Sequence, residues 1–340
     1  MTVITQEIPA SVEAVLAPPA AARNPVSLGL FAIPLGFAGL AGTWLAAEQQ
    51  LGAPAAPEEV LYAVSAVCWI VLTSLYVRFG LRRFHSFQED LKHPGSGAFT
   101  SFIPAVAVLL SAHYAQYWPE VGRWVTAAFV TALFLIAAQL FATWFSTGIE
   151  ASSLNSGFYV PIIAGPFIAS IGLTTVGFTQ AGLVVMGAGL FFWITFGTIV
   201  MNRHITGSRE THAVSPSLSA FLAAPATGGV GWIISHPGPI DEVQYFLTGV
   251  LLTMLLIQLI LIGAYRKLKF SLQFWVFTFP AASTVNFIVR WLAKAQYPGW
   301  SAIAWGLLGI VSIFFAIVAV GSVVLLVKTS RRKHTALRQR

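Results

Sequence analysis

Long apolar runs alternate with short polar segments along nearly the whole chain. A helix needs about 20 predominantly apolar residues to cross the hydrocarbon core of a bilayer. Ten runs of about this length occupy approximately residues 25–48, 57–80, 97–116, 121–146, 153–176, 179–202, 216–236, 241–264, 271–294 and 299–327. The pattern predicts an all-α integral membrane domain of ten transmembrane helices joined by short connections.

Proline recurs in every second run. Pro34, Pro104, Pro161, Pro225 and Pro280 each lie about seven to nine residues inside an odd-numbered run, whereas prolines near the even-numbered runs stand only at their ends. The mean spacing, (280 − 34)/4 or about 61 residues, corresponds to one helical hairpin per repeat. Proline removes an N–H from the helix and collides with the carbonyl four residues back, so each odd helix is predicted to kink.

The kinks have a consequence for the arrangement of the helices. In lipid, a break in backbone hydrogen bonding is tolerated only where it is buried in protein or faces a water-filled cavity. Small residues, which allow close helix packing, gather near the prolines, as at Gly36, Gly39, Gly228 and Gly229. Single prolines are common in membrane helices generally, so the alternation carries the prediction. We expect five kinked helices inside, lining a central pore, and five straight helices outside.

Composition and charge agree with a membrane protein and set its orientation. Charged residues make up only 9% of the chain, against roughly a quarter in soluble domains. Of the Lys and Arg residues, 16 fall on one side of the predicted topology and only Arg123, Arg290 and Lys294 on the other. Basic loops lie in the cytoplasm. We therefore expect a multi-pass protein of the cell inner (plasma) membrane with both termini cytoplasmic, and the net charge of +7 gives no indication of nucleic-acid binding.

The same reasoning divides the chain into three parts. Residues 1–24, rich in Ala and Pro, are expected to form a disordered cytoplasmic tail. Residues 25–328 form the ten-helix transmembrane channel domain, and residues 329–340 form a basic cytoplasmic tail. The single cysteine, Cys68, cannot form a disulfide within the chain.

The predicted pore is poor in charge and rich in aromatic rings. No Asp, Glu or Lys stands near the five prolines, which argues against a pump built on a buried acid and against an acidic cation filter. Rings precede the prolines instead, and they can line and close a constriction or simply pack between helices. The pore-lining candidates are Phe31, Phe102, Phe158 and Phe221, with Phe279 directly before Pro280.

Two further features favour anions. The helix that restarts at each proline exposes N–H groups, which carry partial positive charge, although the freed carbonyls act against this. Arg290, ten residues beyond Pro280, is a candidate cation at the outer mouth or a residue that extends to the interface. Asn155 and Asn286 could contact an ion or bond between helices. The histidines show no ligand spacing and no nucleophile has a base, so we expect no metal, no cofactor and no enzyme activity.

Three segments resemble a known family. They are Pro25 to Trp44 (PVSLGLFAIPLGFAGLAGTW), Ser215 to Pro225 (SPSLSAFLAAP) and Phe274 to Pro280 (FWVFTFP), which are similar to the first, seventh and ninth helices of the TehA / slow-type anion channel family. That family includes tellurite-resistance proteins and sulfite and malate transporters. The resemblance implies five helical hairpins in quasi-fivefold arrangement and a homotrimer with one pore per subunit. It also implies a phenylalanine gate at Phe279 and a second pore phenylalanine at Phe102.

These observations predict an anion channel that passes small monovalent anions such as chloride and nitrate. The main alternative is a secondary transporter or exporter of an oxyanion or dicarboxylate, such as sulfite, malate or a tellurite-related ion. The missing carboxylate counts against a proton-coupled carrier without excluding one. A non-conducting membrane scaffold or sensor is a third, more distant class.

Overall fold

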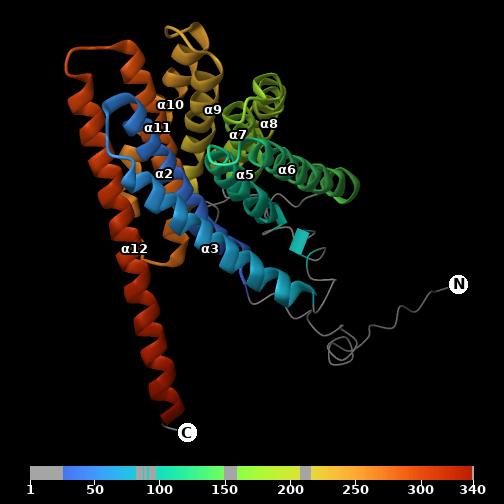
Figure 1. Ribbon diagram of the computed structural model, residues 1–340. Coiled ribbons are helices and arrows are strands. Elements are labelled where there is room, and N and C mark those ends of the chain that lie inside the picture. The colour runs from blue at the N-terminus through green and yellow to red at the C-terminus, as the bar shows by residue number, and fades with distance from the viewer. Residues whose placement is uncertain are drawn as a thin grey trace, which may run out of the picture.

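The computed structural model describes residues 26–81, 87, 90–91, 97–148, 159–206 and 216–338, except for the side chains of 80–81, 159–161 and 330–338. Helices form nearly all of this described part, and it contains no strand. Figure 1 shows the helices as one bundle, with α12 extending well beyond the others at one end.

Five helices, which we call the inner helices, each begin with a short 3₁₀ or π segment that leads into an α-helix. They are η1 (Leu28–Phe31) with α2 (Ala32–Leu51), η2 (Gly97–Ser101) with α5 (Phe102–Tyr114), η4 (Tyr159–Ala164) with α7 (Gly165–Thr175), η6 (Pro216–Leu222) with α9 (Ala223–Ser235), and η7 (Leu272–Phe277) with α11 (Thr278–Ala295). The outer helices are α3 (Ala56–Leu81), α6 (Pro119–Thr147), α8 (Thr179–Thr206), α10 (Glu242–Tyr265) and α12 (Trp300–Arg338).

Length and apolar composition allow most of these helices to cross a membrane. The described residues contain nine helices long and apolar enough to do so, and a shorter apolar helix, Ile162–Thr175, in the fifth predicted run. The start predicted for that run, residue 153, lies outside the described residues. The prediction of a multi-pass helical membrane protein is confirmed.

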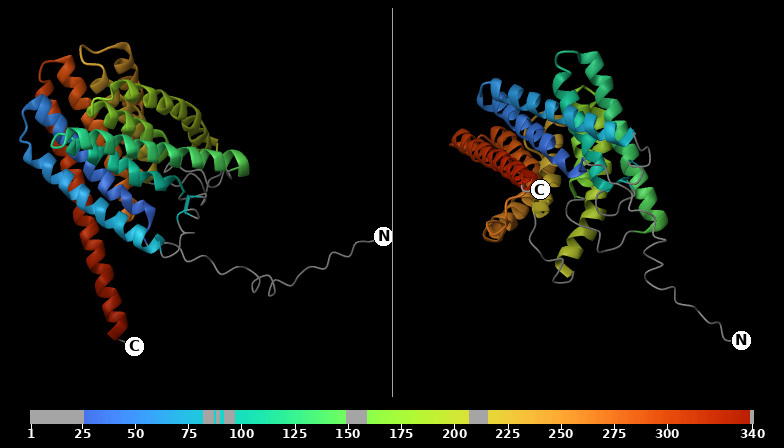
Figure 2. Two further views of the ribbon diagram at one scale, coloured as in Figure 1. Left: turned by 45° about the vertical axis from the view of Figure 1, so that its right-hand side comes forward. Right: turned by 90° about the horizontal axis from the view of Figure 1, so that it is seen from below.

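The inner helices form a closed ring. α2 packs against α5, α5 against α7, α7 against α9, α9 against α11, and α11 against α2. Each outer helix packs against the inner helix of its own hairpin, and α3, α6, α8 and α12 also contact a second inner helix. Figure 2, seen from below, shows the first and last hairpins, in blue and red, on adjoining sides of the bundle. The chain therefore repeats one hairpin five times around an axis.

Burial follows this division. In the most apolar windows of the four membrane-length inner helices, 56–78% of residues are buried, against 11–28% in the outer helices. Large apolar side chains such as Ile260 and Phe145 are 82% and 86% exposed on the outer helices, where lipid would cover them. The predicted separation into inner and outer helices is thus confirmed.

The prolines mark a change of helix type at the start of each inner α-helix. Pro34, Pro104, Pro225 and Pro280 are each the third residue of their α-helix, directly after a 3₁₀ segment. A proline ring collides with the carbonyl four residues back only in α geometry, and tighter 3₁₀ winding ahead of the proline relieves that collision. The sequence predicted a kink inside one continuous helix, and the structure instead shows a 3₁₀-to-α junction.

Two further details differ from the prediction. In the fifth run, Pro161 lies within the π segment η4, and α7 begins four residues later with Pro166 at its second position. At the end of the chain, α12 continues to Arg338, so most of the segment predicted as a basic tail extends the last helix. The N-terminal tail predicted for residues 1–24 lies outside the described residues.

The ring closes where α2 meets α11. Gly36 packs directly against Thr278, because a Cβ at Gly36 would overlap the Thr278 hydroxyl. The Thr43 hydroxyl donates hydrogen bonds to the carbonyls of Gly39 and Ala282, each at 2.9 Å. Small residues therefore bring the two backbones close together, as expected for packed membrane helices.

Candidate functional site: a cavity within the ring

A cavity of about 170 Å³, the central cavity, lies inside the ring of inner helices. All five inner helices contribute to it, and the outer helix α3 adds Tyr62. The inner-helix residues that line it are Ala38, Gly39, Gly42, Leu45, Gln49, Leu109, Ala112, His113, Ile171, Thr175, Thr227, Val230, Ile234, Phe279, Ser283, Asn286 and Arg290.

One face of α11 supplies the polar side of the central cavity. Phe279, Ser283, Asn286 and Arg290 follow one another at intervals of four, three and four residues, a spacing that places side chains on one face of an α-helix. Phe279 lies at the start of α11 and Arg290 lies three turns further along. The cavity therefore runs from the level of the proline junctions toward the C-terminal ends of the inner helices.

Arg290 is the cation of the central cavity. Its Nε donates to Asn286 Oδ1 at 2.9 Å, and Nη1 donates to Gln49 Oε1 at 3.1 Å. In the described part of the chain, Arg290 has no carboxylate within ion-pair distance. Two neutral amide groups thus orient a guanidinium that has no carboxylate partner among the described residues.

Phe279 lies at the opposite end of the cavity. Its side chain is 5% exposed, and its ring packs against Gly39 of α2. Of the five phenylalanines singled out from the sequence, Phe279 is the one that lines the central cavity among the residues whose side chains are described. The ring therefore lies at the end of the cavity that is nearer the proline junctions.

A wider space, the mouth cavity, adjoins the central cavity at the C-terminal ends of the inner helices. Its volume is about 350 Å³, and it shares five residues with the central cavity. The shared residues are Leu45, Gln49, Ala112, His113 and Thr175. Arg123 from α6 also lines the mouth cavity, where its Nη1 lies 3.5 Å from Glu120 Oε1 and its guanidinium covers the Phe178 ring.

The lining of both spaces is uneven in charge. The described residues that line them include Arg290, Arg123 and His113, but no Asp or Glu. Three neutral polar side chains complete the polar surface, those of Asn286, Thr227 and Ser283. This composition favours a negatively charged occupant over a cation.

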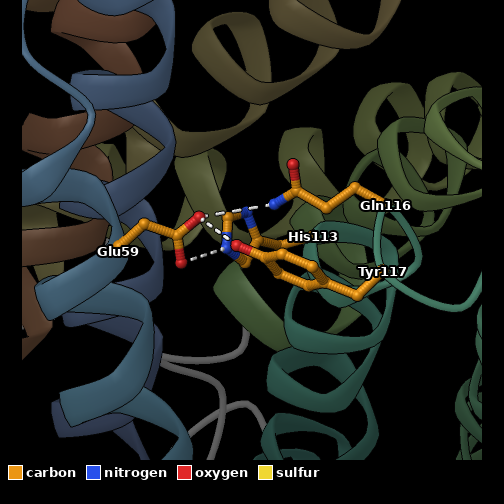
Figure 3. A network of polar contacts seen from close by, with 4 residues as sticks. All are labelled: Glu59, His113, Gln116 and Tyr117. Carbon is orange, nitrogen blue, oxygen red and sulfur yellow. Dashed lines mark hydrogen bonds and ion pairs between the residues drawn. The ribbon is translucent and has the colours of Figure 1, made fainter.

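A polar network lies beside the mouth cavity, where α3 begins and α5 ends. Tyr117 Oη donates to Glu59 Oε1 at 2.9 Å, and the Gln116 amide reaches the same oxygen at 3.4 Å. His113 Nε2 lies 3.3 Å from Glu59 Oε2 (Figure 3). The hydrogen bond to the Glu59 carboxylate raises the pKa of the Tyr117 phenol above its ordinary value, because ionised Tyr117 could not donate it.

Three of the other candidate phenylalanines are described, and they lie outside both cavities. Phe31 is fully buried with its ring at the edge of Tyr76, Phe102 stacks on Phe99, and Phe221 meets the edge of His204. Phe158 lies outside the described residues, as does Asn155. A pore-lining role for these four phenylalanines stays a prediction.

The expected positive helix starts are partly occupied by the protein itself. The N–H of Ala32 donates to carbonyls of η1, and the N–H of Thr278 donates to Trp275 in η7. Because the 3₁₀ segments supply these partners, the N–H groups of Ala32 and Thr278 are not available to an anion. The charge of the cavity therefore depends on Arg290 and the groups at its mouth.

Sequence reasoning missed several residues of this site. Gln49, Tyr62 and His113 line the central cavity, and Gln49 and Tyr62 are separated in the sequence from every proline junction. The signal that could have found Gln49 is its place four residues after Leu45 on the Gly39–Gly42–Leu45 face of α2. Nothing in the sequence pairs His113 with Glu59, since they belong to different hairpins.

Five hairpins around an enclosed cavity, in a chain with nine described membrane-length helices, define a membrane transport protein. The sequence matches the family described as voltage-dependent anion channel (SLAC1) over residues 25–323, and the chain belongs to this family. It is 25% identical over 265 residues to the tellurite resistance protein TehA homolog of Haemophilus influenzae, covering 77% of this chain and 80% of that protein. It is 21% identical over 254 residues to the S-type anion channel SLAH2 of Arabidopsis thaliana, covering 72% and 47%. The resemblance found in the sequence is confirmed, and anion transport is the activity that the family supports.

Proposed function

We propose that the chain is an anion channel that passes small monovalent anions, chloride and nitrate among them, through a pore within each subunit. The observation that carries this proposal is the central cavity, which holds Arg290 without a carboxylate partner and has no acid in its described lining. Phe279 is proposed as the gate.

Electrostatics support the preference for anions. Two unit charges about 5 Å apart interact by roughly 3 kcal/mol at an effective dielectric constant near 20. An anion beside Arg290 would gain attraction of this order, while a cation would lose as much. Neutral donors on Asn286 and Thr227 can replace part of the water around a weakly hydrated anion. A site with one unpaired cation holds a monovalent anion weakly enough for it to leave, as conduction requires.

The position of Phe279 supports its role as a gate. The ring lies at the end of the cavity toward the proline junctions, and it is almost fully buried between α2 and α11. An apolar ring across a narrow passage blocks ions by filling the space and by excluding water. Movement of the Phe279 side chain would connect the central cavity to the space at the N-terminal ends of the inner helices.

The acid-free lining also favours a channel over a proton-coupled carrier. A carrier for an oxyanion or dicarboxylate, such as sulfite, malate or a tellurite-related ion, would need a step that links substrate to a coupling ion or to a conformational cycle. The described residues of the two cavities offer no carboxylate for that step. The name of the Haemophilus influenzae relative keeps oxyanion export as the alternative to test.

We further propose the orientation and assembly of the protein. The excess of basic residues at the N-terminal ends of the inner helices favours cytoplasmic termini, with the mouth cavity facing the outside of the cell inner membrane. A homotrimer with one pore per subunit agrees with a cavity enclosed by a single chain, because the ring needs no second subunit to close.

The test is the reversal potential of current through purified protein in planar bilayers, for wild type and Phe279→Ala. We expect little current from wild type, and from Phe279→Ala a large current that reverses at the chloride equilibrium potential. Phe287→Ala is the matched control, because Phe287 lies on α11, is 1% exposed and does not line the cavity. If Phe279→Ala conducts no better than wild type, the assignment of Phe279 as the gate is wrong. Strict one-for-one exchange, or flux that requires a proton gradient, would replace the channel by a carrier.

A further inference from the structure

Three metal-ligating side chains converge beside the mouth cavity. Glu58 and Glu59 stand in the first turn of α3, and His113 stands in the last turn of α5. One ligand atom from each of the three lies within 4.8 Å of the other two. The described residues contain no other such cluster of three.

Packing fixes the orientation of His113. Its side chain is 2% exposed, and its ring stacks on Tyr62 with the ring centroids 3.7 Å apart. In this position Nε2 faces Glu59 Oε2 at 3.3 Å. Two ligand bonds of about 2.0–2.1 Å at a tetrahedral angle would separate their ligand atoms by roughly 3.4 Å, so this pair already has the spacing of a zinc site.

Glu58 supplies the second, independent observation. It is 3% exposed, and its Oε2 is buried without a hydrogen-bond partner in the described part of the chain. Leaving a buried carboxylate oxygen without a donor or cation is costly. No Lys or Arg of the described residues lies within ion-pair distance of Glu58, and the neighbour of its carboxyl group is the carboxyl group of Glu48, with which it shares a hydrogen bond. Glu58 thus meets a second carboxyl group and no cation among the described residues.

Helix stabilisation does not account for this arrangement. Acidic residues in the first turn favour a helix through its dipole, and they do so at exposed as well as at partly buried positions. That effect requires neither the burial of Glu58 nor its convergence with a histidine from another hairpin. A bound cation would account for both features.

We propose that Glu58, Glu59 and His113 bind a divalent transition-metal ion, most readily Zn²⁺. Imidazole with carboxylates is a usual donor set for zinc, whereas Ca²⁺ needs six to eight oxygen ligands. The Glu59 side chain is 37% exposed, so the ion can enter from solvent on that side. Water would then supply the fourth ligand of the ion. Tyr117 and Gln116 donate to Glu59 Oε1 and so direct Oε2 toward His113, as outer hydrogen bonds do in metal sites (Figure 3).

The location indicates what the ion would do for the protein. It would join α3 to α5, which belong to different hairpins, at a point where His113 lines both cavities. The site would therefore brace the mouth of the ring. Metal binding at this site stands independently of the anion selectivity proposed above.

The test is titration of the full-length detergent-purified protein with Zn²⁺ by isothermal calorimetry. We expect one Zn²⁺ per chain in wild type and at least about tenfold weaker binding in Glu58→Gln and His113→Gln. His236→Gln is the matched control, because His236 stacks on Trp232 and lies outside the cluster. This control should bind Zn²⁺ as wild type does, and Ca²⁺ should not compete with Zn²⁺ in wild type.

A second measurement uses wild type alone and therefore does not depend on whether the variants fold. Co²⁺ added to wild type should give the visible absorption bands of a four-coordinate site, and Zn²⁺ should abolish them and raise the melting temperature. Absence of stoichiometric Zn²⁺ binding to wild type would overturn the proposal. So would unchanged Zn²⁺ affinity in folded Glu58→Gln and His113→Gln. None of these results depends on current through the protein.

Discussion

The ring of Phe279 lies in contact with Gly39, where the first and last inner helices meet. A Cβ added to Gly39 would lie 2.9 Å from Phe279 Cδ2 and 3.4 Å from Ala282 Cβ. The first distance is shorter than carbon atoms normally approach, so the ring occupies the space that a side chain on α2 would fill. The Phe279 ring can thus occupy its position because residue 39 on the neighbouring helix is glycine.

Gly39→Ala should therefore destabilise the protein through Phe279. Overpacking of this kind costs about 1–3 kcal/mol. The cost should fall in the Phe279→Ala background, since the ring that the new methyl meets is gone. A double-mutant cycle by denaturation in detergent should show a coupling energy of about 0.5–3 kcal/mol. Gly187→Ala is the control, because a Cβ there meets nothing within 4 Å, and it should be neutral or slightly stabilising. Additive effects of the two substitutions would contradict the contact.

Arg290→Gln should reduce anion conductance measured in the Phe279→Ala background. Glutamine keeps hydrogen bonding to Asn286 but removes the charge that attracts an anion into the cavity. Arg290→Lys should keep part of the conductance, because it retains the charge without the planar guanidinium. The decrease should be larger at low salt, where screening is weaker.

The control for this prediction is Lys294→Gln. Lys294 lies one turn further along α11, donates to the His236 carbonyl at 3.0 Å and does not line the central cavity. If Lys294→Gln lowers conductance as much as Arg290→Gln, the cavity position of Arg290 has no special part in conduction.

Thr43→Val should weaken the closure of the ring. Valine has nearly the shape of threonine but loses the hydroxyl that bonds to the Ala282 carbonyl across the α2–α11 contact. A buried hydrogen bond of this kind contributes about 1 kcal/mol, and the loss should appear as a lower melting temperature in detergent. Thr131→Val, at an exposed hydroxyl that bonds only within its own helix, should change the melting temperature much less.

Asp241 should make stability depend on acid pH. It caps α10 and accepts from the Gln244 N–H and from Trp232 Nε1, each at 2.8 Å. Partial burial favours the neutral acid, but these hydrogen bonds outweigh it and hold the pKa of Asp241 below its ordinary value. A carboxylate with a lowered folded-state pKa contributes stability above its unfolded pKa of about 3.9, and this is lost as pH falls through the folded value.

Melting temperatures measured from pH 7 down to pH 3 test this expectation. Wild type should lose stability below about pH 4. Asp241→Asn can still accept the Gln244 N–H but does not titrate, so its melting temperature should fall less steeply over that range. Parallel curves for the two proteins would show that Asp241 does not contribute to the acid dependence.

Much of the architecture could be predicted because it depends on local patterns. Apolar length identified the spans, and the alternation of prolines identified the inner helices. Phe279 and Arg290, which were selected by their distance from Pro280, both line the central cavity. These features repeat along the chain or lie close together on one helix, so sequence spacing was sufficient.

The remaining features depend on contacts between distant segments or on a choice between similar geometries. The 3₁₀ segments before Pro34, Pro104, Pro225 and Pro280 differ from the predicted kinks, because the clash at a proline can be relieved either by a kink in an α-helix or by 3₁₀ winding ahead of it, and the apolar pattern does not distinguish the two. The approach of Glu59 to His113 joins residues 54 apart in different hairpins, so no spacing rule could find it. The expectation of no metal site rested on spacings within single helices, and the site proposed at Glu58, Glu59 and His113 joins two helices.

The seam between α2 and α11 has a consequence for how the protein is made. Thr43 and Ala282, which meet there, are 239 residues apart in the chain. At about 5–20 residues per second, a ribosome needs roughly 10 to 50 s to reach the second partner after making the first. During that interval the bare glycine-rich flank of α2 faces lipid or an insertion factor. The ring therefore cannot close before the fifth hairpin is made, and a nascent chain that stalls earlier would leave the lumen open along one side.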